Sequence, residues 1–317
     1  MKKMGTFGFV LVCVIAFGVS FGAAFKWNMT RIGSAPYKYL KVPKDESVYK
    51  VEYDLDSNGS DDTKYDLYYP SQIDKNRNYS LIFFIHGGGF TTGDKEDGAK
   101  LCPYYASHGM IAVSANYSLT SKEHPANLNM MYDELIGTIA AVKVRCAEMG
   151  FNVTEMATTG ESAGGGLAVL LAYRTPKKQP IPIKFVFAQS APVYFEPVEW
   201  GFTEEKDQAD FVTNMTGRSF SVNDIDSESY LSAIEEISPA AYINENSVPA
   251  ILGYGPRDIV VPPEIKHHIL DQLDKYNVTH TYIDFSNSGH GLLHDLDKSE
   301  EYYKTVDEYI GKYFENK

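Results

Sequence analysis

Cysteine is scarce in this chain of 317 residues, which contains only Cys13, Cys102 and Cys146. Cys13 lies in an N-terminal apolar segment, so the other two could form at most one internal disulfide. The sequence therefore excludes the class of small proteins held together by disulfides. Because 44% of the residues are hydrophobic, the chain has the composition of a globular protein with a substantial core.

Positive charge is also in short supply. The chain has 29 Lys and Arg residues against 42 Asp and Glu residues, a formal net charge of −13. Proteins that bind nucleic acid or anionic membrane surfaces through charge need clustered Lys and Arg side chains. The composition therefore argues against a nucleic-acid partner and against electrostatic binding to a membrane surface.

The first 25 residues have the pattern of a secretory signal. Lys2 and Lys3 precede an uncharged, mostly apolar run over residues 4–24, which ends on Gly22-Ala23-Ala24. About 20 apolar residues can also span a bilayer, so a cleaved signal peptide and a retained membrane anchor are both open. Either reading predicts an extracytoplasmic protein, secreted or anchored by this segment, with residues 26–47 as a linker.

Seven Asn-x-Ser/Thr sequons occur along the chain, a pattern compatible with a glycosylating secretory pathway. Their first residues are Asn28, Asn58, Asn78, Asn116, Asn152, Asn214 and Asn277. The support is weak, because Asn116 closes an apolar strand-like run and is expected to be inaccessible.

The folded domain is expected to begin with a β-hairpin. The β-rich segments Val48–Asp54 and Thr63–Tyr69 flank Ser57-Asn58-Gly59-Ser60, which is typical of a tight turn, and Pro70 ends the second strand. The turn also resembles the start of a calcium-binding loop. Its twelfth position, however, is Tyr65 where a bidentate Glu is needed, so the pattern favours the hairpin.

Strand-like and helix-like segments then alternate along the chain. The predicted strands are short apolar runs at Leu81–Ile85, Met110–Val113, Met156–Thr159, Phe185–Ala188, Ala250–Leu252 and Thr281–Phe285. The predicted helices cover Leu128–Met149, Gly164–Tyr173, Glu264–Tyr276 and Ser299–Phe314. This alternation predicts an α/β fold over residues 48–317, with a mostly parallel sheet, helices on both faces and the antiparallel hairpin at its start.

One segment departs from the alternation. The stretch after the sixth strand, about residues 193–237, is too long for an ordinary connection. Residues 196–236 carry eleven acidic side chains against Lys206 and Arg218, a net charge of −9. Such an insertion is typical of a lid or cap over a site, and a solvated surface excursion is the alternative.

Gly160-Glu161-Ser162-Ala163-Gly164 is a Gly-x-Ser-x-Gly motif that follows a predicted strand and opens a predicted helix. The turn is so sharp that the serine is strained, and glycines two positions on either side let the neighbouring backbone approach. Ser162 would present its hydroxyl above the sheet, beside a helix N-terminus that favours a developing oxyanion. The motif therefore predicts a serine nucleophile.

His86-Gly87-Gly88-Gly89-Phe90 directly follows the predicted strand Leu81–Ile85. Consecutive glycines expose backbone N–H groups without side chains that obstruct a substrate, as stabilisation of a tetrahedral intermediate requires. A phosphate-binding loop is the competing use, but no Gly-Lys-Ser/Thr follows. We therefore expect an oxyanion-binding loop, in which His86 has a structural role.

A serine hydroxyl is a weak nucleophile until an imidazole takes its proton and a carboxylate fixes the tautomer of that imidazole. Asp258 follows the predicted strand Ala250–Leu252, and His290 lies in Ser288-Gly289-His290-Gly291 after the last predicted strand. Sites in open α/β sheets are built at such strand ends. We predict Asp258 and His290 as the partners of Ser162, with His294 as the rival base.

Together these motifs resemble those of α/β-hydrolases of the His-Gly-Gly-Gly type, the hormone-sensitive-lipase-like and related carboxylesterase families. The resemblance extends from about Val48 to the C-terminus and includes Ser238-Pro239-x-x-Tyr242. It implies an oxyanion hole formed by the backbone of Gly88, Gly89 and Ala163, and a triad of Ser162, Asp258 and His290. One departure is that hormone-sensitive-lipase-like enzymes usually carry an N-terminal cap, whereas this chain has its insertion after the sixth strand.

The sequence thus predicts an exported serine hydrolase that cleaves carboxylic esters of small or carbohydrate-linked substrates through an acyl-enzyme. No cofactor or metal is expected. A peptidase or amidase on the same fold is one alternative. The other is a binding protein on a hydrolase scaffold that has lost catalysis.

Overall fold

In the computed structural model, residues 39–41, 48–55 and 63–315 are described. Their centre is an eight-stranded sheet with the order β1-β2-β4-β3-β5-β6-β7-β8. The strands are β1 (Val48–Asp54), β2 (Lys64–Pro70), β3 (Asn78–Ile85), β4 (Ile111–Ala115), β5 (Asn152–Glu161), β6 (Ile183–Gln189), β7 (Ala250–Tyr254) and β8 (His280–Asp284).

The reversed strand of the sheet is β2, which runs antiparallel to both β1 and β4, while the other neighbouring pairs are parallel. The predicted fold class is therefore confirmed: a mostly parallel sheet with an antiparallel hairpin at its start. The turn Ser57-Asn58-Gly59-Ser60, and with it most of the loop that resembles a calcium site, lies outside the described residues.

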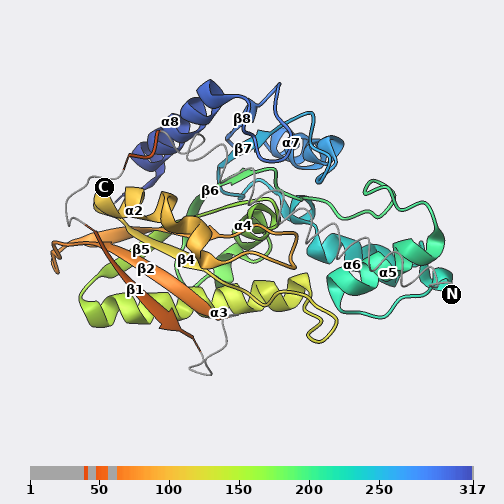
Figure 1. Cartoon of the computed structure of the whole chain (residues 1–317), viewed down its shortest axis with the longest axis horizontal. Coiled ribbons are helices and arrows are strands. Elements are labelled where there is room, and N and C mark those ends of the chain that lie inside the picture. Colours follow the sequence, from red (N-terminus) through yellow and green to blue (C-terminus); the bar gives the residue numbers. More distant parts are fainter. Residues whose placement is uncertain (1–38, 42–47, 56–62, 316–317) are drawn as a thin grey trace, which may run out of the picture.

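Helices cover both faces of the sheet. The α-helices are α2 (Leu101–Ser107), α3 (Leu128–Met149), α4 (Ala163–Tyr173), α5 (Glu205–Thr216), α6 (Glu228–Ile237), α7 (Lys266–Lys275) and α8 (Leu296–Tyr313). Short 3-10 helices are η1 (Lys95–Ala99), η2 (Pro176–Lys178), η3 (Val222–Asp224), η4 (Pro239–Tyr242) and η5 (Pro263–Ile265). Figure 1 shows α2 and α8 on one side of the sheet and α3 on the other.

The core is divided by the sheet into two layers, as the central strand β3 illustrates. Leu81, Phe83 and Ile85 point into the layer shared with α3, α4 and α7, whereas Ile82 and Phe84 point into the layer shared with α2 and α8. All five side chains are buried. Fully burying one such side chain contributes about 1.5–3 kcal/mol, so a continuous apolar run is stable only as a strand covered on both faces.

The second layer also takes a contribution from residues 26–47, the segment predicted as a linker. Leu40 is buried in it, and the Tyr39 hydroxyl donates a hydrogen bond to Asp307 of α8 over 3.1 Å. Within residues 26–47, only residues 39–41 are described. The predicted signal or anchor over residues 1–25 also lies outside the described residues. Among the helices described, none is long and apolar enough to cross a membrane.

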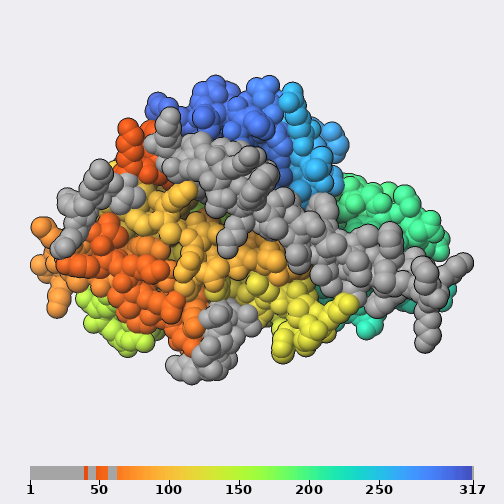
Figure 2. Space-filling view, viewed as in Figure 1, coloured from red at the N-terminus to blue at the C-terminus, as the bar shows by residue number. Residues whose placement is uncertain are grey.

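The acidic insertion folds into the helices α5 and α6, which pack together through a small cluster of their own, formed by Val212, Tyr230, Ala233 and Ile234. They lie past the end of the sheet in Figure 1 and form one end of the molecule in the space-filling view of Figure 2. Arg174, directly after α4, connects α6 to α3. It donates to Glu236 over 2.9 Å and to Asn129 of α3 over 2.7 Å.

The two cysteines of the described chain are buried and form no disulfide with each other. Cys102 belongs to α2 and Cys146 to α3, which contribute to different layers of the core. Burial raises the pKa of the Cys146 thiol to about 12. Both cysteines therefore act as small apolar core residues.

Candidate active site

Ser162 occupies the sharp turn between β5 and α4. Its backbone has φ 55° and ψ −128°, and its N–H donates to the Gln189 carbonyl over 2.9 Å. A Cβ atom at Gly160 would lie 2.5 Å from the Ile85 carbonyl oxygen, and one at Gly164 would lie 2.1 Å from it. Both glycines are therefore needed because the turn packs directly on the end of β3.

The structure brings Ser162, His290 and Asp258 into one hydrogen-bonded chain. His290 Nε2 lies 2.7 Å from Ser162 Oγ, and His290 Nδ1 lies 2.7 Å from Asp258 Oδ2. An ionised carboxylate only accepts hydrogen bonds, so Nδ1 carries a proton toward Asp258. In the neutral imidazole, Nε2 is then the acceptor that faces the serine hydroxyl.

Asp258 is held in place from its other oxygen. Its Oδ1 accepts the backbone N–H groups of Val260 and Val261 over 2.8 and 3.0 Å. The side chain is 2% exposed, and that of His290 is 6% exposed. Hydrogen bonds between such groups are stronger away from water, so the pair is fixed in both orientation and tautomer.

The glycine loop lies beside the serine. A Cβ atom at Gly87 would be 3.3 Å from the Ser162 Cβ atom, and Gly88 and Gly89 have φ values of 113° and 62°, which favour glycine. No acceptor in the described part of the chain bonds the N–H groups of Gly88, Gly89 or Ala163. Three backbone donors that could receive an oxyanion therefore accompany the serine.

His86 has the structural surroundings that the sequence predicted for it. The ring is buried, stacks on Tyr117 with a centroid distance of 4.4 Å, and places Nδ1 2.8 Å from the Gly87 carbonyl oxygen. The Tyr117 hydroxyl donates to the His86 carbonyl over 3.0 Å. Burial lowers the pKa of His86, so the ring remains neutral and supports the glycine loop.

His294, the rival base, does not reach the serine. Its side chain is exposed, and its backbone N–H donates to Ser288 Oγ over 3.0 Å. It closes the loop that carries His290 and directly precedes Asp295, the residue before α8. The geometry therefore favours His290 as the base.

A row of aromatic rings leads from the glycine loop to the insertion, which the sequence had not indicated. Phe90 follows Gly89, and its ring centroid lies 6.5 Å from that of Phe195. Phe195 in turn stacks on Trp200 at 5.7 Å with an interplanar angle of 8°. Phe90 and Phe195 are buried and Trp200 packs against the same core, so the row anchors the start of the insertion beside the glycine loop. An aromatic residue next to the glycine run is the signal that could have indicated it.

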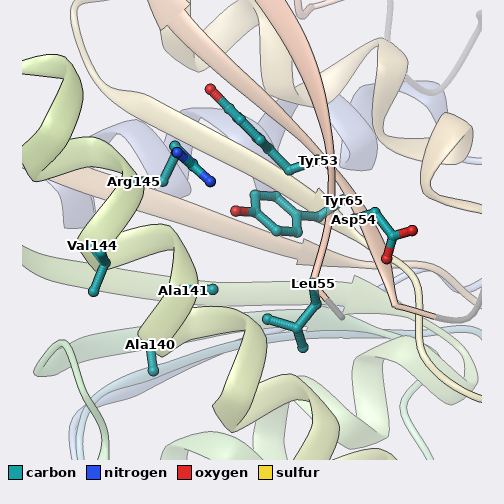
Figure 3. Close-up of a pocket in the computed structure, with 8 residues that line it drawn as sticks. All are labelled: Tyr53, Asp54, Leu55, Tyr65, Ala140, Ala141, Val144 and Arg145. Carbon is teal, nitrogen blue, oxygen red and sulfur yellow. The ribbon is translucent and has the colours of Figure 1, made fainter. Parts of the chain in front are cut away.

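A separate cavity of about 330 Å³ lies between the β1–β2 hairpin and α3 (Figure 3). Its lining residues are Tyr53, Asp54, Leu55, Tyr65, Ala140, Ala141, Val144 and Arg145. The Arg145 guanidinium lies 4.8 Å from the centroid of the Tyr53 ring. The cavity contains none of the predicted site residues.

Within the part of the chain that the structure describes, no group of three or more His, Cys, Asp or Glu residues is arranged to hold a metal ion.

Comparison with known protein families gives one match over most of the chain. The model of the BD-FAE family matches residues 65–273. This range runs from β2 through most of α7 and includes the glycine loop, Ser162 and Asp258, while His290 lies beyond it.

Individual relatives are similar to this chain at less than 30% identity. The probable carboxylic ester hydrolase LipM of Mycobacterium tuberculosis is 28% identical over 242 residues, which cover 72% of this chain and 53% of LipM. The carboxylesterase NlhH of the same species is 26% identical over 159 residues, or 49% of this chain and 47% of NlhH. The chain thus matches about half the length of these relatives.

Solved structures share the fold. Esterase Est2 of Thermogutta terrifontis has a TM-score of 0.67 and 20% identity, covering 86% of this chain and 94% of Est2. Esterase B of Lactobacillus rhamnosis has a TM-score of 0.67 and 19% identity, covering 95% of this chain and 98% of its own. A truncated carbohydrate esterase from gut microbiota also has a TM-score of 0.67, at 15% identity, covering 86% and 99% respectively.

Proposed function

Because the chain belongs to the BD-FAE family of α/β-hydrolase esterases, we propose that it hydrolyses carboxylic esters through an acyl-enzyme on Ser162. The observation that carries the proposal is the chain of two 2.7 Å contacts from Asp258 through His290 to Ser162. The names of the relatives LipM and NlhH, both ester hydrolases, support the same reaction class.

In the acylation step, the Ser162 hydroxyl attacks the ester carbonyl while its proton passes to His290 Nε2. Asp258 stabilises the imidazolium through Nδ1 without taking the proton. The tetrahedral intermediate collapses when the imidazolium donates that proton to the departing alkoxide oxygen, which leaves as the alcohol. Water then attacks the acyl-enzyme with His290 as the base, and the second collapse releases the acid and restores Ser162.

The developing oxyanion is proposed to bind the N–H groups of Gly88, Gly89 and Ala163. Ala163 is the first residue of α4, so its N–H lies at the positive end of the helix dipole. In enzymes of this kind the loss of one oxyanion donor costs about 10²–10³ in kcat. Rigid backbone donors suit this task because they need no rearrangement as the charge forms.

The test is hydrolysis of p-nitrophenyl acetate by the wild-type protein and by Ser162→Ala. We expect kcat to fall by roughly a thousandfold or more, because the nucleophile is removed while the fold is kept. Circular dichroism confirms that the variant is folded. Turnover close to that of the wild type in the folded variant would rule out Ser162 as the nucleophile.

We further propose that the protein acts outside the cytoplasm on small or carbohydrate-linked esters. The location is supported by Lys2, Lys3 and the apolar run over residues 4–24. The substrate class is supported by the likeness in fold to a protein described as a carbohydrate esterase. A panel of p-nitrophenyl esters of increasing acyl length, acetylated sugars and matched anilides would identify the preferred acyl group and separate esterase from amidase activity.

A further inference from the structure

Asp295 is a buried carboxylate that the mechanism does not use. It directly precedes α8, where an Asp side chain ordinarily accepts a hydrogen bond from the first turn of the helix. Here the carboxylate makes no such bond. Its Oδ2 instead accepts Ser288 Oγ over 2.6 Å and the Asn287 N–H over 3.0 Å, and its Oδ1 accepts Asn287 Nδ2 over 2.7 Å. The carboxylate is thus turned back onto the loop before the helix.

Ser288, the main partner of Asp295, joins two loops of the candidate site. Its Oγ accepts the His294 N–H over 3.0 Å, which closes the loop around His290. Its carbonyl accepts the Arg257 N–H over 3.2 Å, one residue before Asp258. Ser288 is fully buried. The serine therefore sets the separation between the loop that carries the base and the loop that carries the acid.

On this basis, and given the proposed esterase function, we propose that Asp295 is a positioning residue: through Ser288 it holds the His290 loop against the Asp258 loop. The imidazole needs this support because its two 2.7 Å contacts lie on opposite sides of the ring. A displacement of about 1 Å can cost on the order of a hundredfold in rate. Ser190, the residue directly after β6, supports the same loop, since its Oγ donates to the His290 carbonyl over 2.8 Å.

The charge state of Asp295 suits this role. Burial alone raises its pKa, but hydrogen bonds from Ser288 and Asn287 outweigh that effect, and the net pKa lies below its ordinary value. An ionised carboxylate can accept all three of the hydrogen bonds described above. The Asp295→Asn change keeps the shape and removes the negative charge, so the hydrogen bonds from Ser288 and Asn287 lose their charged acceptor.

The test compares Asp295→Asn and Ser288→Ala with the control Asp284→Asn. Asp284 is an exposed carboxylate just before the same loop and accepts Ser286 Oγ over 2.6 Å. Two measurements are made on each variant, well below the melting temperature of that variant. The first gives kcat and KM on p-nitrophenyl acetate, and the second gives the rate constant for phosphonylation of Ser162 by a fluorophosphonate. We expect kcat and the phosphonylation rate to fall together by roughly ten- to a hundredfold in both test variants, with KM nearly unchanged. The control should match the wild type.

Several results would overturn the positioning role. If the folded test variants react at the wild-type rate, even with a lower melting temperature, Asp295 is only structural. An equal loss of kcat in Asp284→Asn would show that any substitution near this loop lowers activity, and that the contact of Asp295 with Ser288 has no specific role. If Asp295→Asn does not fold, Ser288→Ala decides, since it removes the hydroxyl that bonds Asp295 and the His294 N–H and keeps the backbone carbonyl that accepts the Arg257 N–H. A wild-type protein that neither hydrolyses esters nor reacts with the fluorophosphonate would instead refute the proposed function itself.

Discussion

Ser162 has a backbone conformation that a non-glycine residue adopts only when its surroundings enforce it. Its φ of 55° and ψ of −128° correspond to a strained state, which costs about 1–3 kcal/mol. Two backbone hydrogen bonds hold the turn, from Ser162 N–H to Gln189 over 2.9 Å and from Gly166 N–H to Ser162 over 3.0 Å. This backbone conformation places the Ser162 hydroxyl 2.7 Å from His290 Nε2.

At the same scale, the structure separates the two histidines of one loop. His290→Ala should reduce kcat about as much as Ser162→Ala, because members of a triad act as a unit. His294→Ala should stay within a few-fold of the wild type, since the exposed His294 side chain does not contact Ser162. Steady-state kinetics on both purified, folded variants is the measurement. The reverse ranking would assign the role of the base to His294.

The sequence predicted Ser162, Asp258 and His290 because each lies in a short, glycine-containing segment after a strand. It could not predict Asp295 or Ser190. Ser190 bonds a residue 100 positions away in the chain, and Asp295 has the sequence pattern of an ordinary helix cap. Hydrogen bonds of this kind leave no local pattern and become visible only when the loops are folded together.

At the scale of elements, the acidic insertion lies next to the glycine loop. Phe195, near the start of the insertion, contacts Phe90, which directly follows the glycine loop. Glu196 is the next residue in the chain and precedes α5. Burial raises the pKa of Glu196, and the negative charges of Glu199 and Asp226 raise it further. A net charge of −9 over residues 196–236 should therefore disfavour anionic substrates.

This predicts a salt effect that depends on substrate charge. The value of kcat/KM for an anionic ester should rise with added salt, because the Debye length shortens to about 8 Å near physiological strength. A neutral ester with the same acyl group should show little change. Replacing the exposed Glu204, Glu205, Glu228 and Glu235 with Gln should remove the difference. Equal salt dependence for both esters would mean that the insertion does not influence the entrance.

Elements with a long or strongly apolar pattern were predictable from the sequence. The helix α3 spans Leu128–Met149 as predicted, and each predicted apolar run corresponds to a strand of the sheet. The seven-residue helix α2 was missed because it is too short to show a helical period. The pairing of β2 with β4 was also not predictable, since strand order depends on contacts distant in sequence.

At the scale of the whole molecule, the candidate site exists only when the sheet is assembled. Ser162 and His290 are 128 residues apart, and Asp258 lies 32 residues before His290. They meet because β5, β7 and β8 run parallel and end at the same edge of one sheet. Reactivity of the serine should therefore be a property of the native fold and not of the local Gly-x-Ser-x-Gly sequence.

The most direct test of the central claim is covalent labelling of the full chain with a fluorophosphonate, followed by mass spectrometry of the peptides. We predict a single phosphonylated residue, Ser162, in the native protein, and no label after denaturation or in Ser162→Ala, because His290 must take the serine proton. Labelling at another residue, or no labelling of the native protein, would contradict the account of Ser162 as an activated nucleophile.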